Sequence, residues 1–367
     1  MKISKFSFHY LLTFFLIILN HAKSQSQQNL HNQEHETLMK IKQHLQNPPN
    51  LNHWTSSNTT YCSSWPEITC TNGSVTGLTL ANYNINQTIP SFICDLKNLT
   101  HVDFNNNYIP GMFPTYLYNC SKLEYLDLSM NNFVGKIPEN IFTLSNLNYL
   151  NLSYTNFTDD IPSSIGKLKK LRFLALQVCL FNGTFPDEIG DLANLETLDL
   201  SNNLFKSSTL PLNWTKLSKL QVFYMYVCNL FGEMPESMGD MVSLEDLDIS
   251  QNGLTGKIPS GLFMLKNLRR LLLSRNDLSG ELPGVVEALN LTIIDLAQNN
   301  LTGKIPDDFG KLQKLTGLSL PVNNFSGEIP QSIGQLPSLV DFKVFMNNLS
   351  GMLEFLHKFW FLRIFFI

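Results

Sequence analysis

The sequence is poor in charge. Only 15% of its 367 residues are Asp, Glu, Lys or Arg, against roughly a quarter in typical soluble domains. The 26 basic and 30 acidic residues give a net charge of −4, which argues against a nucleic-acid-binding protein with a clustered basic excess. Six cysteines are too few for a disulfide-stapled miniprotein. The 26 Phe and 11 Tyr exceed what a disordered acidic chain carries, so the chain is expected to fold.

The sequence is instead rich in asparagine, and its prolines recur at a regular spacing. The 39 Asn outnumber all Asp and Glu together. Eleven of the 17 prolines recur at steps of 23 to 25 residues, mostly 24, and each follows Ile, Leu, Phe or Met. These prolines are Pro90, Pro114, Pro138, Pro162, Pro186, Pro211, Pro235, Pro259, Pro283, Pro306 and Pro330. A period of this length indicates a repeat architecture rather than the two or three domains that the length suggests.

Before each proline stands a block of the form Leu-x-Leu-x-x-Asn-x-Leu/Phe-x-Gly. Clear copies occupy 126–135, 247–256, 271–280 and 318–327, and twelve copies fit between Val75 and Gly351. This is the leucine-rich repeat pattern. It predicts an α/β solenoid, a superhelix of about twelve 24-residue repeats with a parallel β-sheet on the inner face.

The asparagine of each block is expected to point inward where the chain leaves its strand. There its amide can satisfy buried backbone groups of its own and the neighbouring turns. Eight copies have Asn in this slot: Asn107, Asn131, Asn203, Asn252, Asn276, Asn299, Asn323 and Asn347. Four copies substitute Tyr83, Thr155, Cys179 and Cys228.

A cap is predicted in front of the repeats, at residues 25–74. Residues 34–45 place Leu38, Ile41 and Leu45 on one face of a helix. A disulfide between Cys62 and Cys70, beneath two tryptophans, then covers the edge of the first repeat.

The other four cysteines divide into two pairs. Cys94 and Cys120 are 26 residues apart, on consecutive repeats, and could form a second disulfide. Cys179 and Cys228 share a slot two repeats apart, which is too far for a disulfide, so buried thiols are expected there.

The two ends differ from the repeats. Residues 1–24 carry a basic start, an apolar core at 10–19 and small residues before Gln25, which predicts a secretory signal peptide. Residues 352–367 form a hydrophobic tail interrupted by charge, interpreted as a divergent or truncated end, with an interfacial membrane segment as the alternative. No second cysteine pair follows the repeats at this end, so the solenoid is expected to end uncapped.

Secretion makes the glycosylation motif Asn-x-Ser/Thr meaningful. Thirteen copies predict a glycoprotein of the secretory pathway, at the extracellular face of the plasma membrane or in the apoplast. They are Asn58, Asn72, Asn86, Asn98, Asn119, Asn151, Asn156, Asn182, Asn213, Asn290, Asn300, Asn324 and Asn348.

Solvent-facing strand positions carry the candidate ligand site. Tyr125, Tyr149 and Phe173 occupy one offset in three consecutive repeats and predict an exposed aromatic stripe, with charge farther along the face. The complete prediction is Tyr125, Tyr149, Tyr154, Phe173, Gln177, Tyr224, Tyr226, Asp246, Arg270 and Arg275. The alternative is that strands favour Tyr and Phe, which neighbours or glycans then cover.

Catalysis has no residue to support it. Adjacent acids such as Asp159 and Asp160 lack a paired base, and the histidines and cysteines show no metal-binding spacing. The sequence therefore predicts a protein that is not an enzyme and has no cofactor, metal or nucleic-acid partner.

The repeat and cap motifs resemble a known family. The 24-residue Leu-x-x-Leu-x-Leu-Ser-x-Asn-x-Leu-x-Gly-x-Ile-Pro repeat and the cap residues Trp54, Cys62, Trp65 and Cys70 are similar to plant leucine-rich repeat receptors, most of all the HAESA-like branch and kinase-less receptor-like proteins. The resemblance covers about residues 25–351. It implies a peptide or protein ligand, self or microbial, on the inner face, and a short-ectodomain co-receptor kinase as partner in immunity or development.

Departures from that family leave alternatives open. The sequence contains no kinase motifs, and Asp341 and Lys343 stand where the branch carries an Arg-x-Arg pair for the ligand carboxylate. The alternatives are a secreted inhibitor resembling polygalacturonase-inhibiting proteins, which carry a cysteine-bearing C-terminal cap, and a truncated decoy ectodomain.

Overall fold

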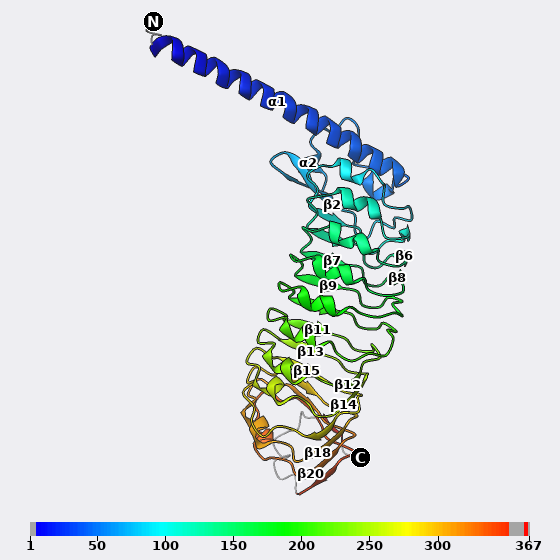
Figure 1. Ribbon diagram of the computed structural model, residues 1–367, viewed down its shortest axis with the longest axis vertical. Helices are drawn as coiled ribbons and strands as arrows, with labels where there is room; N and C mark the ends of the chain where they lie inside the picture. The colour runs from blue at the N-terminus through cyan, green and yellow to red at the C-terminus, as the bar shows by residue number, and fades with distance from the viewer. Residues whose placement is uncertain (1–4, 352–362, 366–367) are drawn as a thin grey trace.

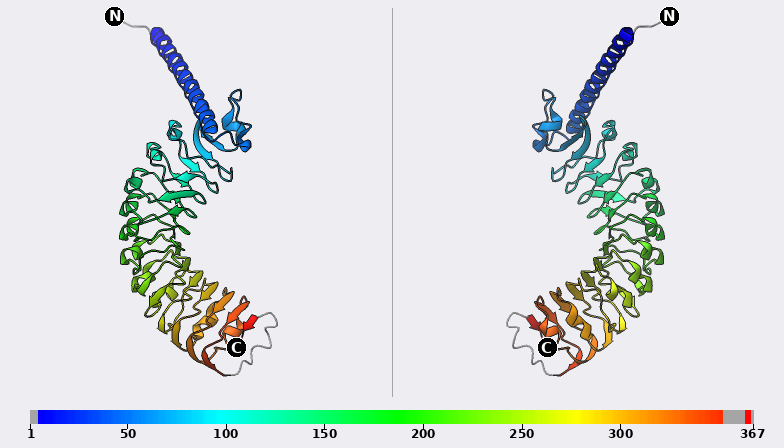
Figure 2. Two further views of the ribbon diagram at one scale, coloured as in Figure 1. Left: turned by 90° about the vertical axis from the view of Figure 1, so that its right-hand side faces the viewer. Right: turned by 90° about the vertical axis from the view of Figure 1, so that its left-hand side faces the viewer.

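The chain forms one curved solenoid with a long helix at its N-terminal end (Figure 1, Figure 2). The computed structural model describes residues 5–351 and 363–365. Helix α1 (Lys5–His44) projects from the first repeats, and a short helix, α2 (Tyr61–Ser64), lies beside its second half. The predicted solenoid is confirmed.

The inner face of the curve is a 14-stranded sheet in which all neighbours after β2 are parallel, while β1 pairs antiparallel with β2. Its strands are β1 (Ile68–Thr71), β2 (Ser74–Thr79), β3 (His101–Asp103), β5 (Tyr125–Asp127), β7 (Tyr149–Asn151), β9 (Phe173–Ala175), β10 (Thr197–Asp199), β11 (Val222–Tyr224), β13 (Asp246–Asp248), β15 (Arg270–Leu272), β17 (Ile293–Asp295), β19 (Gly317–Ser319), β21 (Asp341–Lys343) and β23 (Arg363–Phe365). The strands from β2 to β21 give the twelve repeats that the sequence predicts.

Alternation along each strand explains why these residues form the sheet. In β5, Leu126 is fully buried between the half-exposed Tyr125 and the buried, inner-face Asp127, and Leu128 is again fully buried. The leucines of all repeats stack into one continuous hydrophobic core. Strand pairing follows the proline steps: Thr197 pairs with Val222, 25 residues on, and Arg270 with Ile293, 23 residues on.

Short 3-10 helices line the outer face. Most begin directly after a phased proline, whose carbonyl accepts the first hydrogen bond, as Pro138 O does from Ile141 N at 3.0 Å. They are Pro49–Leu51, Ile93–Asp95, Thr115–Asn119, Glu139–Thr143, Ser163–Lys167, Asp187–Asp191, Leu212–Lys216, Glu236–Asp240, Ser260–Met264, Asp307–Lys311 and Ile333–Gln335. The repeat that contains Pro283, one residue short, has none.

A second set of short parallel strands runs along one flank. These strands are β4 (Pro110–Gly111), β6 (Asn132–Gly135), β8 (Asn156–Phe157), β12 (Phe231–Glu233), β14 (Gly253–Thr255), β16 (Ser279–Glu281), β18 (Asn300–Gly303), β20 (Asn324–Glu328) and β22 (Asn348–Ser350). Between β8 and β12, where one repeat is a residue longer, only two isolated bridges continue the pattern.

The asparagine slot does what the sequence predicts. Asn131 Nδ2 donates to the carbonyls of Phe104, one repeat back, at 2.8 Å, and of Leu128 and Ser129 in its own repeat. Its Oδ1 accepts from Ile109 N at 3.0 Å. The other slot asparagines repeat these donor bonds, so a ladder of amides ties each turn to the one before.

The N-terminal cap covers the first repeat. The expected helix over 34–45 is confirmed as the last part of α1, and Leu38 and Ile41 are fully buried. Glu34, also buried, accepts from Tyr61 Oη at 3.1 Å and from Val75 N at 3.2 Å, which fixes α1 to the start of β2.

A second buried carboxylate joins the cap to the repeats. Trp54 and Trp65 stack with ring centroids 4.8 Å apart, next to Glu67. Glu67 accepts from Trp54 Nε1 at 3.0 Å, from His53 Nε2 at 3.0 Å and from the Tyr83 hydroxyl. Burial works against the charge, yet these donors hold the pKa of Glu67 below its ordinary value.

Both predicted disulfides, Cys62–Cys70 and Cys94–Cys120, are present, and Cys179 and Cys228 are buried thiols. Burial raises the pKa of Cys179, and it raises that of Cys228 to about 12. Neither thiol is therefore a nucleophile at neutral pH.

The ends of the chain differ in part from expectation. α1 runs without a break through the predicted cleavage position before Gln25, and the signal peptide stays a prediction. Within the described residues, no helix has both the length and the apolar character needed to cross a membrane. In the tail, β23 pairs with β21 in the register of the repeat strands, so the sheet extends past residue 351. The rest of the tail, 352–362 and 366–367, lies outside the described residues.

We predict that replacing Glu67 with Gln loosens the cap. The variant loses the charge that three donors stabilise, and the free energy of unfolding should fall by about 2 kcal/mol at neutral pH. Because the folded pKa of Glu67 is depressed, its contribution is present above the ordinary value of 4.5 and is lost as pH falls through the folded pKa. Urea unfolding followed by tryptophan fluorescence should show the two proteins converging toward acid; a constant difference would contradict this account.

The amide ladder supplies a matched pair. Asn131 and Asn203 each donate to three carbonyls, but Asn203 Oδ1 is buried without a partner. Asn131→Ala should therefore destabilise the protein more than Asn203→Ala, by roughly 1 kcal/mol for the additional accepted bond. Thermal unfolding of both variants measures the difference, and equal losses would show that the accepted bond contributes nothing.

Candidate functional site

The sequence-predicted stripe is a stack of rings on the inner face. Tyr125 and Tyr149 lie 4.1 Å apart between ring centroids, and Tyr149 and Phe173 lie 4.3 Å apart, nearly parallel in both cases. The stack extends one strand further than predicted, because His101 on β3 lies 4.0 Å from Tyr125. The spacing is close to the distance between neighbouring strands, which holds the rings face to face.

Stacking decides what the rings present to solvent. Each inner ring covers the faces of its neighbours, so Tyr125 and Tyr149 expose edges and hydroxyls, and burial raises the pKa of both phenols. Phe173 is the last ring. Its register neighbour on β10 is Thr197, a small side chain, so the ring face toward β10 is not covered by another ring.

Asp127 connects the stack to the next row of side chains. Its Oδ1 accepts from Ser129 N at 2.9 Å, and its Oδ2 accepts from Asn151 Nδ2 at 3.0 Å and Tyr149 Oη at 3.4 Å. This carboxylate is therefore surrounded by donors, and it orients the hydroxyl edge of the stack.

A second cluster lies two to four strands beyond Phe173. Arg270 Nη1 donates to Tyr224 Oη at 3.2 Å and lies 3.8 Å from Asp246 Oδ2, while Tyr224 Oη donates to the same Asp246 oxygen at 3.3 Å. The structure thus brings together these three of the predicted residues, from β11, β13 and β15.

The remaining predicted residues lie along the turn side of the sheet. Tyr154 and Arg275 occupy a left-handed backbone slot, with φ of 54° and 57°. Gln177 accepts from the Ser153 hydroxyl, and Arg275 Nη1 donates to Gln251 Oε1 at 3.3 Å. Arg275 is therefore not part of the Arg270 cluster.

Tyr226 links the turn side to the middle of the face. Burial raises the pKa of Tyr226, and the charge on Asp199 raises it further, so these two side chains lie within electrostatic range of each other. Burial also raises the pKa of Asp199, on β10, and that of Asp248, on β13.

Sequence reasoning did not include His101, Asp199 or Asp248, and it placed Asp127 on the inner face without including it in the site. The signal was available, because His101 shares the offset of Tyr125, and the three Asp share the next inner-face offset of their strands. At the end of the sheet, Asp341 and Lys343 form an ion pair of 2.6 Å.

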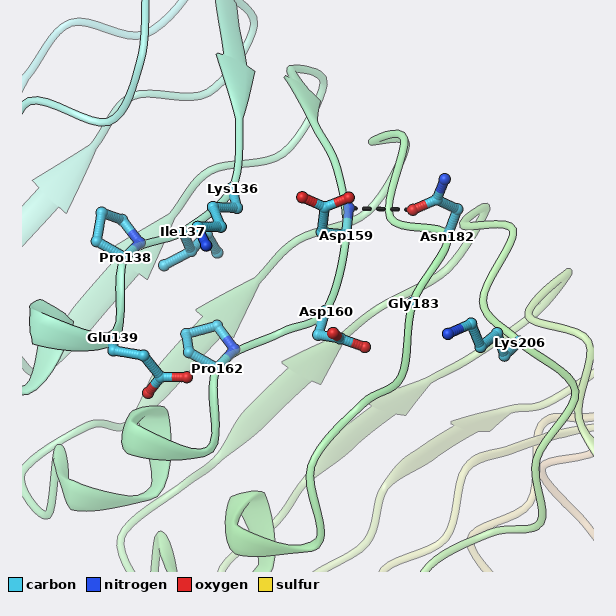
Figure 3. Close-up of a pocket in the computed structure, with 10 residues that line it drawn as sticks. All are labelled: Lys136, Ile137, Pro138, Glu139, Asp159, Asp160, Pro162, Asn182, Gly183 and Lys206. Atoms are coloured by element: carbon cyan, nitrogen blue, oxygen red, sulfur yellow. Dashed lines mark hydrogen bonds between the residues drawn. The ribbon is translucent and has the colours of Figure 1, made fainter.

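The flank of the solenoid carries a pocket of about 610 Å³ beside the interruption of the second strand set (Figure 3). Lys136, Glu139, Asp159, Asp160 and Lys206 supply its charges. Asp160 Oδ1 accepts from Thr184 N and Oγ1, which lowers its pKa, and Asp159 N donates to Asn182 Oδ1 at 3.1 Å. The pocket therefore mixes both signs of charge, and the Asp160 carboxylate bonds within the loop.

The thirteen glycosylation motifs fall into two groups by exposure. Exposed asparagines are Asn72, Asn86, Asn119, Asn156, Asn182, Asn300, Asn324 and Asn348, and half-exposed ones are Asn58, Asn98, Asn151, Asn213 and Asn290. Asn151 is the one that lies on an inner-sheet strand, where its amide is already bonded.

Comparison with known families identifies the repeat. The leucine-rich repeat N-terminal domain matches residues 31–71, a leucine-rich repeat region matches 171–282, and single leucine-rich repeats match 122–144, 146–168 and 290–312. The chain belongs to the leucine-rich repeat family. No curated protein sequence matches it.

Solved structures that resemble this chain include plant receptor ectodomains. The ectodomain of the Arabidopsis receptor kinase HAESA, bound to an extended IDA peptide hormone, is 36% identical with a TM-score of 0.83, over 88% of this chain and 54% of that one. HAESA in complex with IDA and the co-receptor SERK1 is 36% identical with a TM-score of 0.82, over 87% of this chain and 54% of that one. PEPR1 with AtPEP1 is 32% identical with a TM-score of 0.68, over 91% of this chain and 55% of that one. The expected likeness to HAESA-like ectodomains is confirmed, and the chain spans just over half of their length.

Local hydrogen bonding predicts which of two neighbouring motifs carries a glycan. Asn151 Nδ2 donates to Asp127 Oδ2 and Ser129 Oγ, whereas Asn156 is exposed at the start of β8. We expect Asn156 to be modified and Asn151 to remain free in protein secreted from plant cells. Enzymatic deglycosylation in ¹⁸O-water followed by peptide mass spectrometry distinguishes them; a modified Asn151 would contradict the hydrogen-bond argument.

Proposed function

We propose that this protein is an extracellular plant receptor-like protein that binds a peptide or protein ligand on its inner face and signals through a short-ectodomain co-receptor kinase, in immunity or development. The observation that carries the proposal is the inner face itself, where the stack from His101 to Phe173 and the cluster around Arg270 stand on one rigid sheet. Half-buried aromatics beside Arg are the composition of interaction hot spots.

The likeness to HAESA and PEPR1 supports the same proposal. Those ectodomains are solved with IDA and AtPEP1 bound, and HAESA also with SERK1. The two disulfides fit an oxidising, extracellular location. Because function depends on the site rather than on the fold, the ligand of this chain is left to experiment.

The test removes the aromatic surface without disturbing the core. Tyr149, Phe173 and Tyr226, all half-exposed, are replaced together with Ala, and Tyr108→Ala, an exposed tyrosine of the flank, is the matched control. Immobilised wild-type and control protein should capture the same peptides from plant wall fluid, and the triple variant should lose at least about 90% of that capture while still being secreted.

The partner is tested with the captured peptide. The peptide should promote a complex between the chain and a co-receptor ectodomain in size-exclusion chromatography. If instead the purified protein inhibits a pectin-degrading enzyme and never associates with a co-receptor, the receptor proposal is wrong and the inhibitor alternative replaces it.

A further inference from the structure

Negative charge collects on the inner face of a protein that otherwise has little charge. The two outward offsets of the strands from β2 to β21 carry seven Asp: Asp103, Asp127, Asp199, Asp246, Asp248, Asp295 and Asp341. Arg270 and Lys343 are the two Arg or Lys at these offsets, and each forms an ion pair, with Asp246 and Asp341. In the described part of the chain, the other five Asp form no salt bridge.

The fold does not require this charge. Each of the five Asp without a salt bridge uses one oxygen to accept the backbone N–H two residues on, as Asp199 Oδ1 does from Ser201 N at 3.0 Å. Asn151 occupies the same offset and accepts from Ser153 N at 3.1 Å, so a neutral amide does the same structural work. The negative charge is therefore additional to what the turn needs.

Asp199 is the least compensated of these carboxylates in the middle of the face. Asp127 is surrounded by Ser129, Tyr149 and Asn151 donors, and Asp248 accepts from the Ser250 hydroxyl at 2.6 Å. At Asp199, in contrast, the donor is the N–H of the fully buried Ser201, at 3.0 Å. Burial raises the pKa of Asp199 and outweighs this bond and the nearby Ser201 hydroxyl, which both lower it. Nearby Asp248 is the charge that acts most on Asp199, and it repels it.

Aromatic side chains surround Asp199 on its own sheet. Its register neighbours are Ala175 and Tyr224. Ala175 is small and buried, so its side chain does not cover Asp199 from that side. Phe173 lies on the neighbouring strand β9, in register with Thr197, and one face of its ring is directed toward β10. Tyr226 lies on the turn side, close enough for the charge on Asp199 to raise its pKa. A carboxylate in a frame of aromatic rings is the arrangement that recognises an organic cation.

We propose that the ligand places a Lys or Arg side chain over Asp199, between Phe173 and Tyr224. Asp199 Oδ2, the oxygen that does not accept from Ser201 N, accepts a hydrogen bond from the cation. The Phe173 and Tyr224 rings contact the cation by cation–π attraction. This rests on the proposed function, since it names the chemistry of the ligand at the same face. The inner face then selects basic peptides, and the unpaired Asp103, Asp248 and Asp295 attract them along its length.

The experiment selects binders from a random linear peptide library displayed on phage, using the whole secreted chain as bait. Peptides enriched on the wild-type protein should contain more Lys and Arg than the input library. Asp199→Asn, which keeps the oxygen acceptor for Ser201 N, should lose that bias. Asp295→Asn removes the same charge from the same offset four strands away, at a site without the aromatic frame, and should keep the bias.

Affinities then quantify the contact. In fluorescence anisotropy, acetylating the selected lysine should weaken binding to wild-type protein about tenfold and binding to Asp199→Asn by less than about twofold. Thermal unfolding of both variants checks that the fold is intact. Enriched peptides without a basic bias, or a bias that Asp199→Asn retains, would overturn the inference while the proposed function stands. If no peptide is enriched, the peptide-binding function itself fails, and the inference fails with it.

Discussion

The satisfaction of backbone polar groups at the turns is the constraint on which this molecule depends. Every repeat bends away from its strand inside the protein, where unpaired carbonyls and N–H groups are costly. In eight of the twelve repeats an asparagine meets this need: Asn131 donates to three carbonyls and accepts from one N–H, and its counterparts repeat the donor bonds along the sheet. The abundance of asparagine in the sequence thus has a structural cause.

The ladder is weakest in the middle, and local geometry changes there. Thr155, Cys179 and Cys228 replace the slot asparagine; Thr155 and Cys179 bond to the Leu152 carbonyl and Cys228 to the Leu200 carbonyl, but they cannot accept two N–H groups as an amide oxygen does. Asn203 Oδ1 is left without a donor in this stretch, and the flanking strand set is interrupted. The same repeats carry Phe173 and Asp199, so the candidate ligand surface stands where the scaffold is least regular.

The sequence predicted what the period controls and missed what depends on contacts between neighbouring repeats. Twelve inner strands, the slot asparagines, the cap helix and both disulfides follow from spacing and alternation. The ring stack followed in part, because Tyr125, Tyr149 and Phe173 share an offset, but His101 was not among the predicted residues and joins the stack through the strand register. The flank strands depend on backbone approach within the turns, for which the residue pattern gives no direct signal. Pairing of β23 with β21 escaped prediction because its sequence lacks the Leu-x-Leu block.

Comparison between equivalent positions separates scaffold from recognition in a repeat protein. Asn151 and Asp199 accept the same type of backbone N–H, yet one is neutral and donates to Asp127 whereas the other keeps its charge in a setting without a cation. A requirement of the fold would apply to both residues equally. Partial burial makes that charge unfavourable in the free protein, since it raises the pKa of Asp199. A bound cation would offset this unfavourable term, because its positive charge stabilises the ionised carboxylate.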